Sequence, residues 1–301
     1  MATRIGTTSP ATAGRTADAP FVRGLRAELY VAGRRPGVRI AAVLWALQIA
    51  VFAYGAQYLV ARSMGDTLDP AQAEAMLAAL RPDNMGVYVA GSVPGYGIPV
   101  FVVLGALIAA GDYRWGVIRS VLVRFPARTT FVAARWVALQ VLTLLITVLG
   151  LLVGLVGTMV IATLEDGGQI LPSLGSVLLP FLASWLMAAG YSTVGFALGF
   201  VLRSVMAAAA CGVGWLVAVE LLLVGSLAGA VGAVDEVRSV LLTANVGSLA
   251  AGLRGAGGLT DSGLPGLAAV TGPAVAVVAI LGWIVIGLGT AIAVFRRRDI
   301  A

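Results

Sequence analysis

The chain lacks lysine and histidine altogether, and Cys211 is the single cysteine among its 301 residues. Without lysine there can be no phosphate-binding loop of the Gly-Lys-Ser/Thr type and no Schiff-base amine. Without histidine there can be no Ser-His-Asp triad and no His-based metal site. One cysteine allows neither an intrachain disulfide nor a multi-cysteine metal cluster, and its apolar setting favours a small hydrophobic packing role. The sequence therefore predicts a chain that does not hydrolyse ATP by itself.

Charge is also scarce, because 11% of the residues are charged and 59% are hydrophobic. Apolar runs of about 20 residues recur along the chain, which is typical of an all-α integral membrane protein. The runs are continuously apolar and do not alternate, so a transmembrane β-barrel is not favoured. We expect six spans, at about residues 37–60, 96–110, 131–164, 178–202, 206–230 and 270–295.

The arginines are distributed unevenly between the predicted loops. Arg62, Arg81, Arg238 and Arg254 fall on one side, which leaves sixteen of the 20 on the other. The positive-inside rule then predicts that both termini of this multi-pass protein lie in the cytoplasm, and we expect its membrane to be the bacterial plasma membrane. The net charge of +6 is therefore interpreted as a signal of topology. Nucleic-acid binding is not favoured, because the arginines are dispersed beside membrane helices and no recognition module is visible.

The polar N-terminal region divides into two parts. Residues 1–20 are rich in Thr, Ala and Gly and predict a disordered cytoplasmic tail. Residues 21–36 have the pattern of an amphipathic helix lying on the inner leaflet, and Pro36 ends it. The apolar positions on one face of this helix are Val22, Leu25, Leu29 and Ala32. The six-span transmembrane domain then follows, over residues 37–301.

A second amphipathic segment lies between predicted spans 2 and 3. Its sequence is GDYRWGVIRSVLVRFPAR, with Asp112 placed to cap a helix and Pro126 placed to stop it. The apolar stripe consists of Trp115, Ile118, Leu122 and Phe125. Two interpretations stay open on periodicity alone: an interfacial helix that seals the bilayer edge, or a lever held by a cytoplasmic motor domain.

Few polar or special residues lie within the spans. Glu220, in LVAVELLLVG, is costly at membrane depth, and such residues usually face a partner or an aqueous cavity. We favour a structural hydrogen bond over a cation-binding or proton-carrying role. Two GxxxG pairs, Gly150 with Gly154 and Gly195 with Gly199, are candidates for close helix packing. In the outer loops, Asp69 and Pro70 predict the start of a short helix that runs to Leu80, and residues 231–269 predict a mixed helical and flexible cover.

Several short motifs occur in a characteristic order along the chain: RAELYVAGRRPGVR, then GDYRWGVIRSVLVRFPARTTFVAARWVAL, then YSTVGFALGFVLRS, and a last span ending in FRRRDI. In this order the chain resembles the membrane subunit of an ABC exporter of the ABC-2 permease type. The positions that match the family pattern are Asp112, Gly116, Arg119, Arg128, Phe131, Arg135 and residues 295–299. One departure is Val117, where many members carry Thr.

The resemblance implies a division of labour between subunits. The permease would pair with a second copy or with a homologous permease, surrounded by membrane lipids. A separate nucleotide-binding subunit would bind ATP and Mg²⁺, so this chain would carry no cofactor and would not be an enzyme. The residues that the resemblance and the helix pattern assign to contact with the ATPase subunit are Asp112, Tyr113, Arg114, Trp115, Arg119, Arg124 and, secondarily, Glu28.

Two other functions remain open from the sequence. An ion-coupled transporter or channel would use Glu220, and a non-transporting scaffold would use the cytoplasmic helices to recruit a partner. For an exporter, the apolar composition suits lipid, peptide or hydrophobic drug cargo equally.

Overall fold

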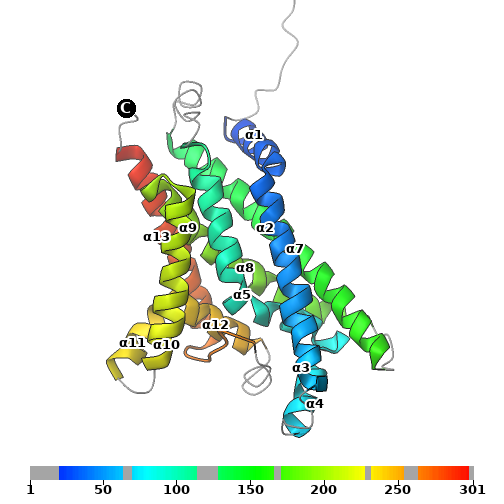
Figure 1. Cartoon of the computed structure of the whole chain (residues 1–301). Helices are drawn as coiled ribbons and strands as arrows, with labels where there is room; N and C mark the ends of the chain where they lie inside the picture. Colours follow the sequence, from blue (N-terminus) through cyan, green and yellow to red (C-terminus); the bar gives the residue numbers. More distant parts are fainter. Residues whose placement is uncertain are drawn as a thin grey trace, which may run out of the picture.

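The computed structural model describes residues 20–63, 70–113, 128–165, 171–227, 232–253 and 264–297. Every regular element within these ranges is a helix, as the sequence predicts (Figure 1). In this described part of the chain, six helical stretches are long and apolar enough to cross a membrane. The protein is therefore an all-α, multi-pass membrane protein with six spans.

The spans are assembled from both single helices and helices with π-helical sections. Span 1 consists of α2 (Pro36–Leu47), the π-helical η1 (Gln48–Ala56) and α3 (Gln57–Ser63). Span 2 consists of the 3-10 turn η2 (Pro82–Asn84) and α5 (Met85–Ala110). Spans 3 and 4 are α7 (Arg128–Leu164) and α8 (Leu174–Leu202). Span 5 consists of α9 (Val205–Gly214), the π-helical η4 (Trp215–Val224) and α10 (Gly225–Leu227), and span 6 is α13 (Pro273–Arg297).

Among the residues that the structure describes, four shorter helices lie outside the spans: α1 (Pro20–Arg34), α4 (Pro70–Ala79), α11 (Gly232–Val240) and α12 (Leu242–Gly252). The helix α1 and the last turn of α13 lie at one end of the bundle, and α4 and α11 lie at the opposite end (Figure 1). The short helix predicted from Pro70 is confirmed as α4, whereas Asp69 lies outside the described residues.

The amphipathic N-terminal helix is present as α1, and it packs against α7. Ala32 is buried and Leu25 and Leu29 are half-buried, so three of the four predicted apolar positions face the protein. Val22 is exposed, with a relative accessibility of 36%. The inward face also carries Glu28, which brings a carboxylate to the surface of α7.

Spans 2 and 4 form the centre of the bundle, since they are the two most buried spans. Their helices approach so closely that a Cβ on Gly195 would collide with the carbonyl oxygen of Val102. A Cβ on Gly199 would come within 2.6 Å of the Ala109 Cβ. The other predicted pair, Gly150 and Gly154, faces the side chains of Trp45 and Val89, also without room for a Cβ.

Span 2 begins earlier than the sequence suggested. We expected it at residues 96–110, but α5 already begins at Met85 and contains Pro94 and Pro99. Proline and glycine lower the helix propensity of this stretch. Proline and glycine are nevertheless tolerated in a buried span, because neighbouring helices supply hydrogen bonds to the backbone around them. Here the Tyr191 hydroxyl donates a hydrogen bond of 3.1 Å to the carbonyl of Pro94.

Spans 4 and 5 are joined by a tight turn at Arg203 and Ser204. Arg203 ends α8 in the left-handed conformation, with φ of 53°, and Ser204 caps α9 by accepting from the amide of Ala207 at 3.3 Å. The turn agrees with the predicted break between residues 202 and 206.

Candidate functional site

An ion-pair cluster lies at the end of the bundle that carries α1. Its centre is Arg135 of α7, whose side chain is 2% exposed. The Arg135 guanidinium donates from Nε to Glu28 of α1 at 3.1 Å and from Nη2 to Asp112, just after α5. Asp112 also pairs through its other oxygen with Arg35, which lies between α1 and α2. We call Glu28, Arg35, Asp112 and Arg135 the basal cluster.

The ends of the helices near these residues explain how their side chains meet. Pro36 begins α2, so Arg35 stands in an extended conformation at the junction of two helices. Its Nη1 donates to the carbonyl of Leu107 at 3.3 Å, one of the last carbonyls of α5. A cation at a helix C-terminus also interacts favourably with the helix dipole. Arg35 therefore holds both the end of α5 and the acidic residue that follows it.

The basal cluster contains two cations and two carboxylates, so it is neutral as a unit. Burial lowers the pKa of the Arg35 guanidinium, and the negative charge of Glu28 works against that shift. The carboxylates of Glu28 and Asp112 keep side-chain exposures of 16% and 22%. Removing one partner of such a pair leaves a charge without compensation in a poorly solvated place.

Aromatic side chains pack directly against the basal cluster. The Arg135 guanidinium lies over the ring of Phe131, 5.1 Å from its centroid, and Phe131 stacks on Phe295 of α13 at 5.6 Å. Phe295 contacts Phe200 of α8, which in turn contacts Tyr113. The aromatic contacts thereby connect the cluster to spans 4 and 6.

Of the seven residues predicted to contact an ATPase subunit, three lie among the described residues. Glu28 and Asp112 belong to the basal cluster, where their carboxylates bind arginines of the same chain. Tyr113 packs edge-on against Phe200, with ring centroids 6.5 Å apart, and Arg203 lies over its ring. The predicted contact residues that lie outside the described residues are Arg114, Trp115, Arg119 and Arg124.

Sequence reasoning missed the role of Arg35, for which the signal was a paired arginine directly before a proline.

A second polar site surrounds Glu220, which is 3% exposed within η4 of span 5. Its Oε1 accepts from Trp215 Nε1 at 2.8 Å, and its Oε2 accepts from the amide and hydroxyl of Thr243 at 2.9 and 3.0 Å. Three donors therefore satisfy one buried carboxylate.

The π-helical section explains why Trp215 and Glu220 share a face. Residues five apart diverge by about 140° in an α-helix, whereas the wider π-turn brings residues i and i+5 together. Thr243 is the second residue of α12, and the N-cap residue Leu241 has no side-chain oxygen to accept from the first turn. Glu220 consequently caps α12 from a different helix. Sequence reasoning identified Glu220 but missed Trp215 and Thr243.

The helix α12 is also tied to the segment that precedes span 6. Ser248 Oγ accepts from the amides of Val270 and Thr271 at 3.0 and 3.1 Å. The Thr271 hydroxyl donates to Asn245 Oδ1 at 3.0 Å. In the same segment, Gly266 adopts φ of +82°, and a Cβ on it would come within 3.1 Å of the backbone of Pro94 and Gly95. By capping α12, Glu220 thus helps to hold α12 and the segment before span 6, which together pack onto α5.

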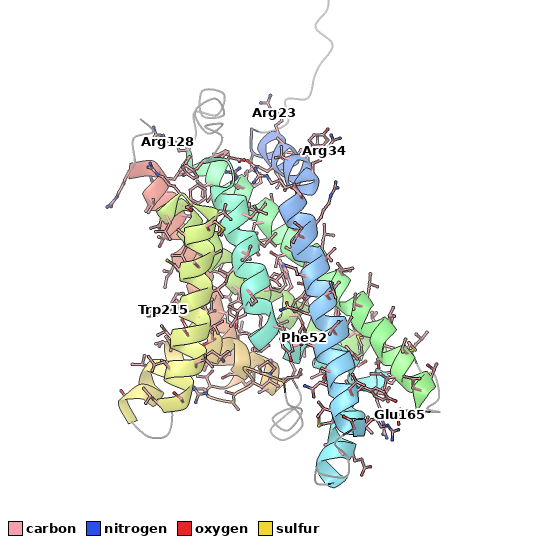
Figure 2. All side chains as sticks on the ribbon, viewed as in Figure 1. Arg23, Arg34, Phe52, Arg128, Glu165 and Trp215 are labelled. Atoms are coloured by element: carbon pink, nitrogen blue, oxygen red, sulfur yellow. The ribbon has the colours of Figure 1, made fainter. Side chains whose placement is uncertain are left out.

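At the same end of the bundle, span 1 is linked to span 3 by an ion pair. Glu165 accepts from Arg62 Nε at 2.9 Å and from the Tyr58 hydroxyl at 2.9 Å (Figure 2 labels Glu165). Partial burial alone would raise the pKa of the Glu165 carboxyl, but hydrogen bonds from Arg62 and Tyr58 outweigh it and hold the pKa below its usual value. This pair is exposed, so we assign it a small structural role.

The described residues contain no cluster of His, Cys, Asp or Glu that could hold a metal ion. Cys211 lies on α9 within span 5 and is exposed on the surface of the bundle. The sites in this part of the chain are thus built from ion pairs and hydrogen bonds.

Comparison with known proteins adds a family assignment. A family model described as "Protein of unknown function (DUF2705)" matches residues 92–301. The matched region begins in α5 and includes Asp112, Arg135 and Glu220. No curated protein matches the chain. Because the family model covers well over half of the sequence, the chain belongs to this family of proteins of unknown function, DUF2705.

Proposed function

We propose that this chain is the membrane permease subunit of an ATP-driven exporter of the ABC-2 type. It moves an unidentified cargo out across the bacterial plasma membrane, and it pairs with a second permease copy or with a homologous permease. A separate nucleotide-binding subunit binds ATP and Mg²⁺ and supplies the energy. The sequence motifs described above support this proposal, and one geometric observation adds to them.

That observation concerns the described residues on either side of residues 114–127, which meet in the basal cluster. This segment connects the end of α5 to α7, and both of its flanks are fixed in the cluster, through Asp112 and Arg135. Arg35 and Glu28 add span 1 and α1 to the same base. Ion pairs in a poorly hydrated setting are electrostatically strong. Force applied to the segment would therefore reach three spans together, as a coupling element requires.

The test is co-purification with an ATPase. We expect the tagged chain to retain a stoichiometric nucleotide-binding subunit, and Trp115→Ala combined with Arg119→Glu to lose it, because a like-charge contact costs several kcal/mol at an interface. Arg81→Glu is the matched control, since Arg81 lies at the far end of the described bundle and is exposed. If the double variant still co-purifies with the ATPase and transports normally, residues 114–127 act only as an interfacial seal.

Orientation is proposed from the arginines. Arg23, Arg34 and Arg128 lie at the same end of the bundle (Figure 2), and we propose that this end faces the cytoplasm. In a Cys211→Ala background, a cysteine replacing Arg128 should resist a membrane-impermeant maleimide in intact cells, whereas one replacing Glu236 should react. Labelling with the opposite preference would reverse the topology.

The surroundings of Glu220 bear on the alternative of an ion-coupled transporter. A carboxylate that binds a cation or carries protons needs access to water or to the ion, whereas Glu220 is buried and accepts from three donors of its own chain. We therefore favour the exporter.

A further inference from the structure

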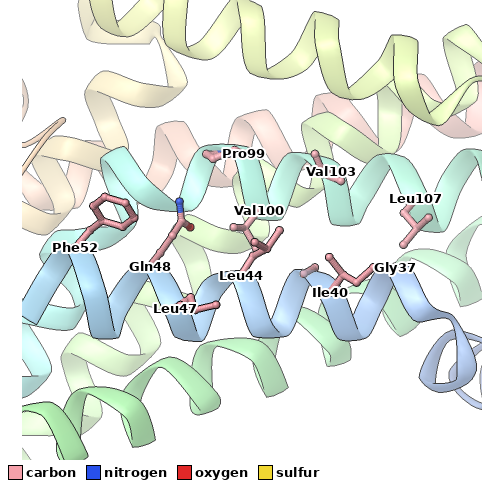
Figure 3. A pocket seen from close by; sticks show the side chains of 11 residues that line it. Gly37, Ile40, Leu44, Leu47, Gln48, Phe52, Pro99, Val100, Val103 and Leu107 are labelled. Atoms are coloured by element: carbon pink, nitrogen blue, oxygen red, sulfur yellow. The ribbon is translucent and has the colours of Figure 1, made fainter. Parts of the chain in front are cut away.

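An apolar groove of about 560 Å³ runs between span 1 and span 2 (Figure 3). One wall comes from α2 and η1 and includes Ile40, Leu44 and Phe52, and the other comes from α5 and includes Val103 and Leu107. Ile40 and Leu44 are 58% and 50% exposed. The groove is therefore accessible from outside the bundle, where the bilayer lies.

Contacts between the two helices limit the groove at both ends. At one end the rings of Phe52 and Tyr96 approach to a centroid distance of 6.2 Å. At the other end, a Cβ on Gly37 would come within 2.6 Å of Leu107 Cδ2, so the helices touch. Between these points the α5 wall contains Pro99, and a proline interrupts the helical hydrogen bonding and bends the helix. The groove is a bounded space with a sideways opening.

The described residues that line the groove include no charged residue and one polar residue, Gln48. Its Oε1 is buried and has no hydrogen-bond partner among the described residues. Figure 3 shows the amide between the walls, pointing toward α5 near Pro99. A space of this size with apolar walls and one well-placed polar group has the usual features of a small-molecule site.

The depth of Gln48 restricts the chemistry of the occupant. It lies 12 residues after Pro36, the first residue of the span, or about 18 Å along the helix axis. This position is close to the middle of a hydrocarbon layer of about 30 Å. At that depth a phospholipid offers only hydrocarbon, which leaves the amide without a partner.

We propose that this groove binds a neutral, lipophilic molecule with a hydroxyl or amide group, which enters sideways from the bilayer and pairs with Gln48. The absence of charge in the lining disfavours ionised ligands, because nothing there compensates their desolvation. The existence of this binding site does not depend on the exporter proposal. Only its interpretation as a site for cargo rests on the proposed function.

Photolabelling tests the site. The chain is reconstituted in phosphatidylcholine nanodiscs and labelled with a diazirine-bearing octanol, and the modified residues are mapped by mass spectrometry. We expect saturable labelling within residues 37–52 and 99–107. Gln48→Leu should weaken it about five- to tenfold, the effect of one lost hydrogen bond. Val103→Trp and Leu44→Trp, which fill the groove from opposite walls, should abolish it, whereas Leu145→Trp on the exposed face of α7 should not.

Four results would overturn the proposal. Labelling spread over all lipid-facing helices would mean that no site exists, and unchanged labelling of Gln48→Leu would remove the role of the amide. Equal labelling by a phosphatidylcholine with a diazirine in its acyl chain would identify the occupant as bulk lipid. If Val103→Cys in a Cys211→Ala background forms disulfide-linked dimers and the groove stays unlabelled, the occupant of the groove is a second copy of the chain.

The ATPase assay separates this proposal from the exporter proposal. All groove variants should elute as monodisperse protein and should still co-purify with the nucleotide-binding subunit. A labelled groove without any ATPase would refute the exporter alone, and a bound ATPase with an unlabelled groove would refute the site alone.

Discussion

Replacing Arg135 with methionine is expected to lower the free energy of unfolding by about 2–4 kcal/mol. Removing one partner of a buried ion pair costs about 3–5 kcal/mol, and we reduce that range because water partly solvates the remaining carboxylates. Both Glu28 and Asp112 would lose a partner, although Asp112 retains Arg35. Chemical unfolding in detergent, followed by tryptophan fluorescence, measures the loss.

Three further variants show whether the effect belongs to the basal cluster. Arg39→Met removes an exposed arginine from α2 and should change the unfolding free energy little. Arg135→Lys keeps the charge but loses the planar fork that binds two carboxylates, so an intermediate loss is expected. In a double-mutant cycle, Glu28→Gln should cost less in the Arg135→Met background than alone. Equal stability of the Arg135→Met and Arg39→Met variants would show that the cluster does not stabilise the fold.

The spans were predictable because their signal is local. A run of about 20 apolar residues must cross the bilayer as a helix, whichever neighbours it finds. Span 2 was predicted too short because Pro94 and the surrounding glycines look like a loop on local propensity, and burial among neighbouring helices overrides that preference. Propensity is a weak predictor wherever tertiary packing supplies most of the stability.

The polar sites were predictable as single residues but not as partners. Glu220 stands out in the sequence as a charge within an apolar run, and Arg135 was noted as a position that matches the family pattern. Their partners lie 23 residues away at Thr243 and 107 residues away at Glu28, and no local pattern relates residues at such separations. The link from Trp215 to Glu220 depends on a π-helical turn, which hydrophobic periodicity does not reveal.

Changing Glu220 to leucine is expected to loosen α12 and to destabilise the protein roughly twice as much as Glu220→Gln. The amide of glutamine retains one acceptor oxygen for the amide and hydroxyl of Thr243 but turns an NH₂ group toward Trp215, so the N–H of the half-exposed Trp215 loses its partner at about 1 kcal/mol. Leucine leaves every donor unsatisfied and removes the cap from the first turn of α12. Hydrogen exchange of α12 amides, followed by mass spectrometry, should therefore accelerate modestly for the Gln variant and strongly for the Leu variant.

Glu236→Gln, which changes an exposed carboxylate on α11, should leave exchange unchanged. A Gln variant that has normal α12 protection but no transport would show that the charge itself is used, and the ion-coupled mechanism would then replace the structural role assigned to Glu220.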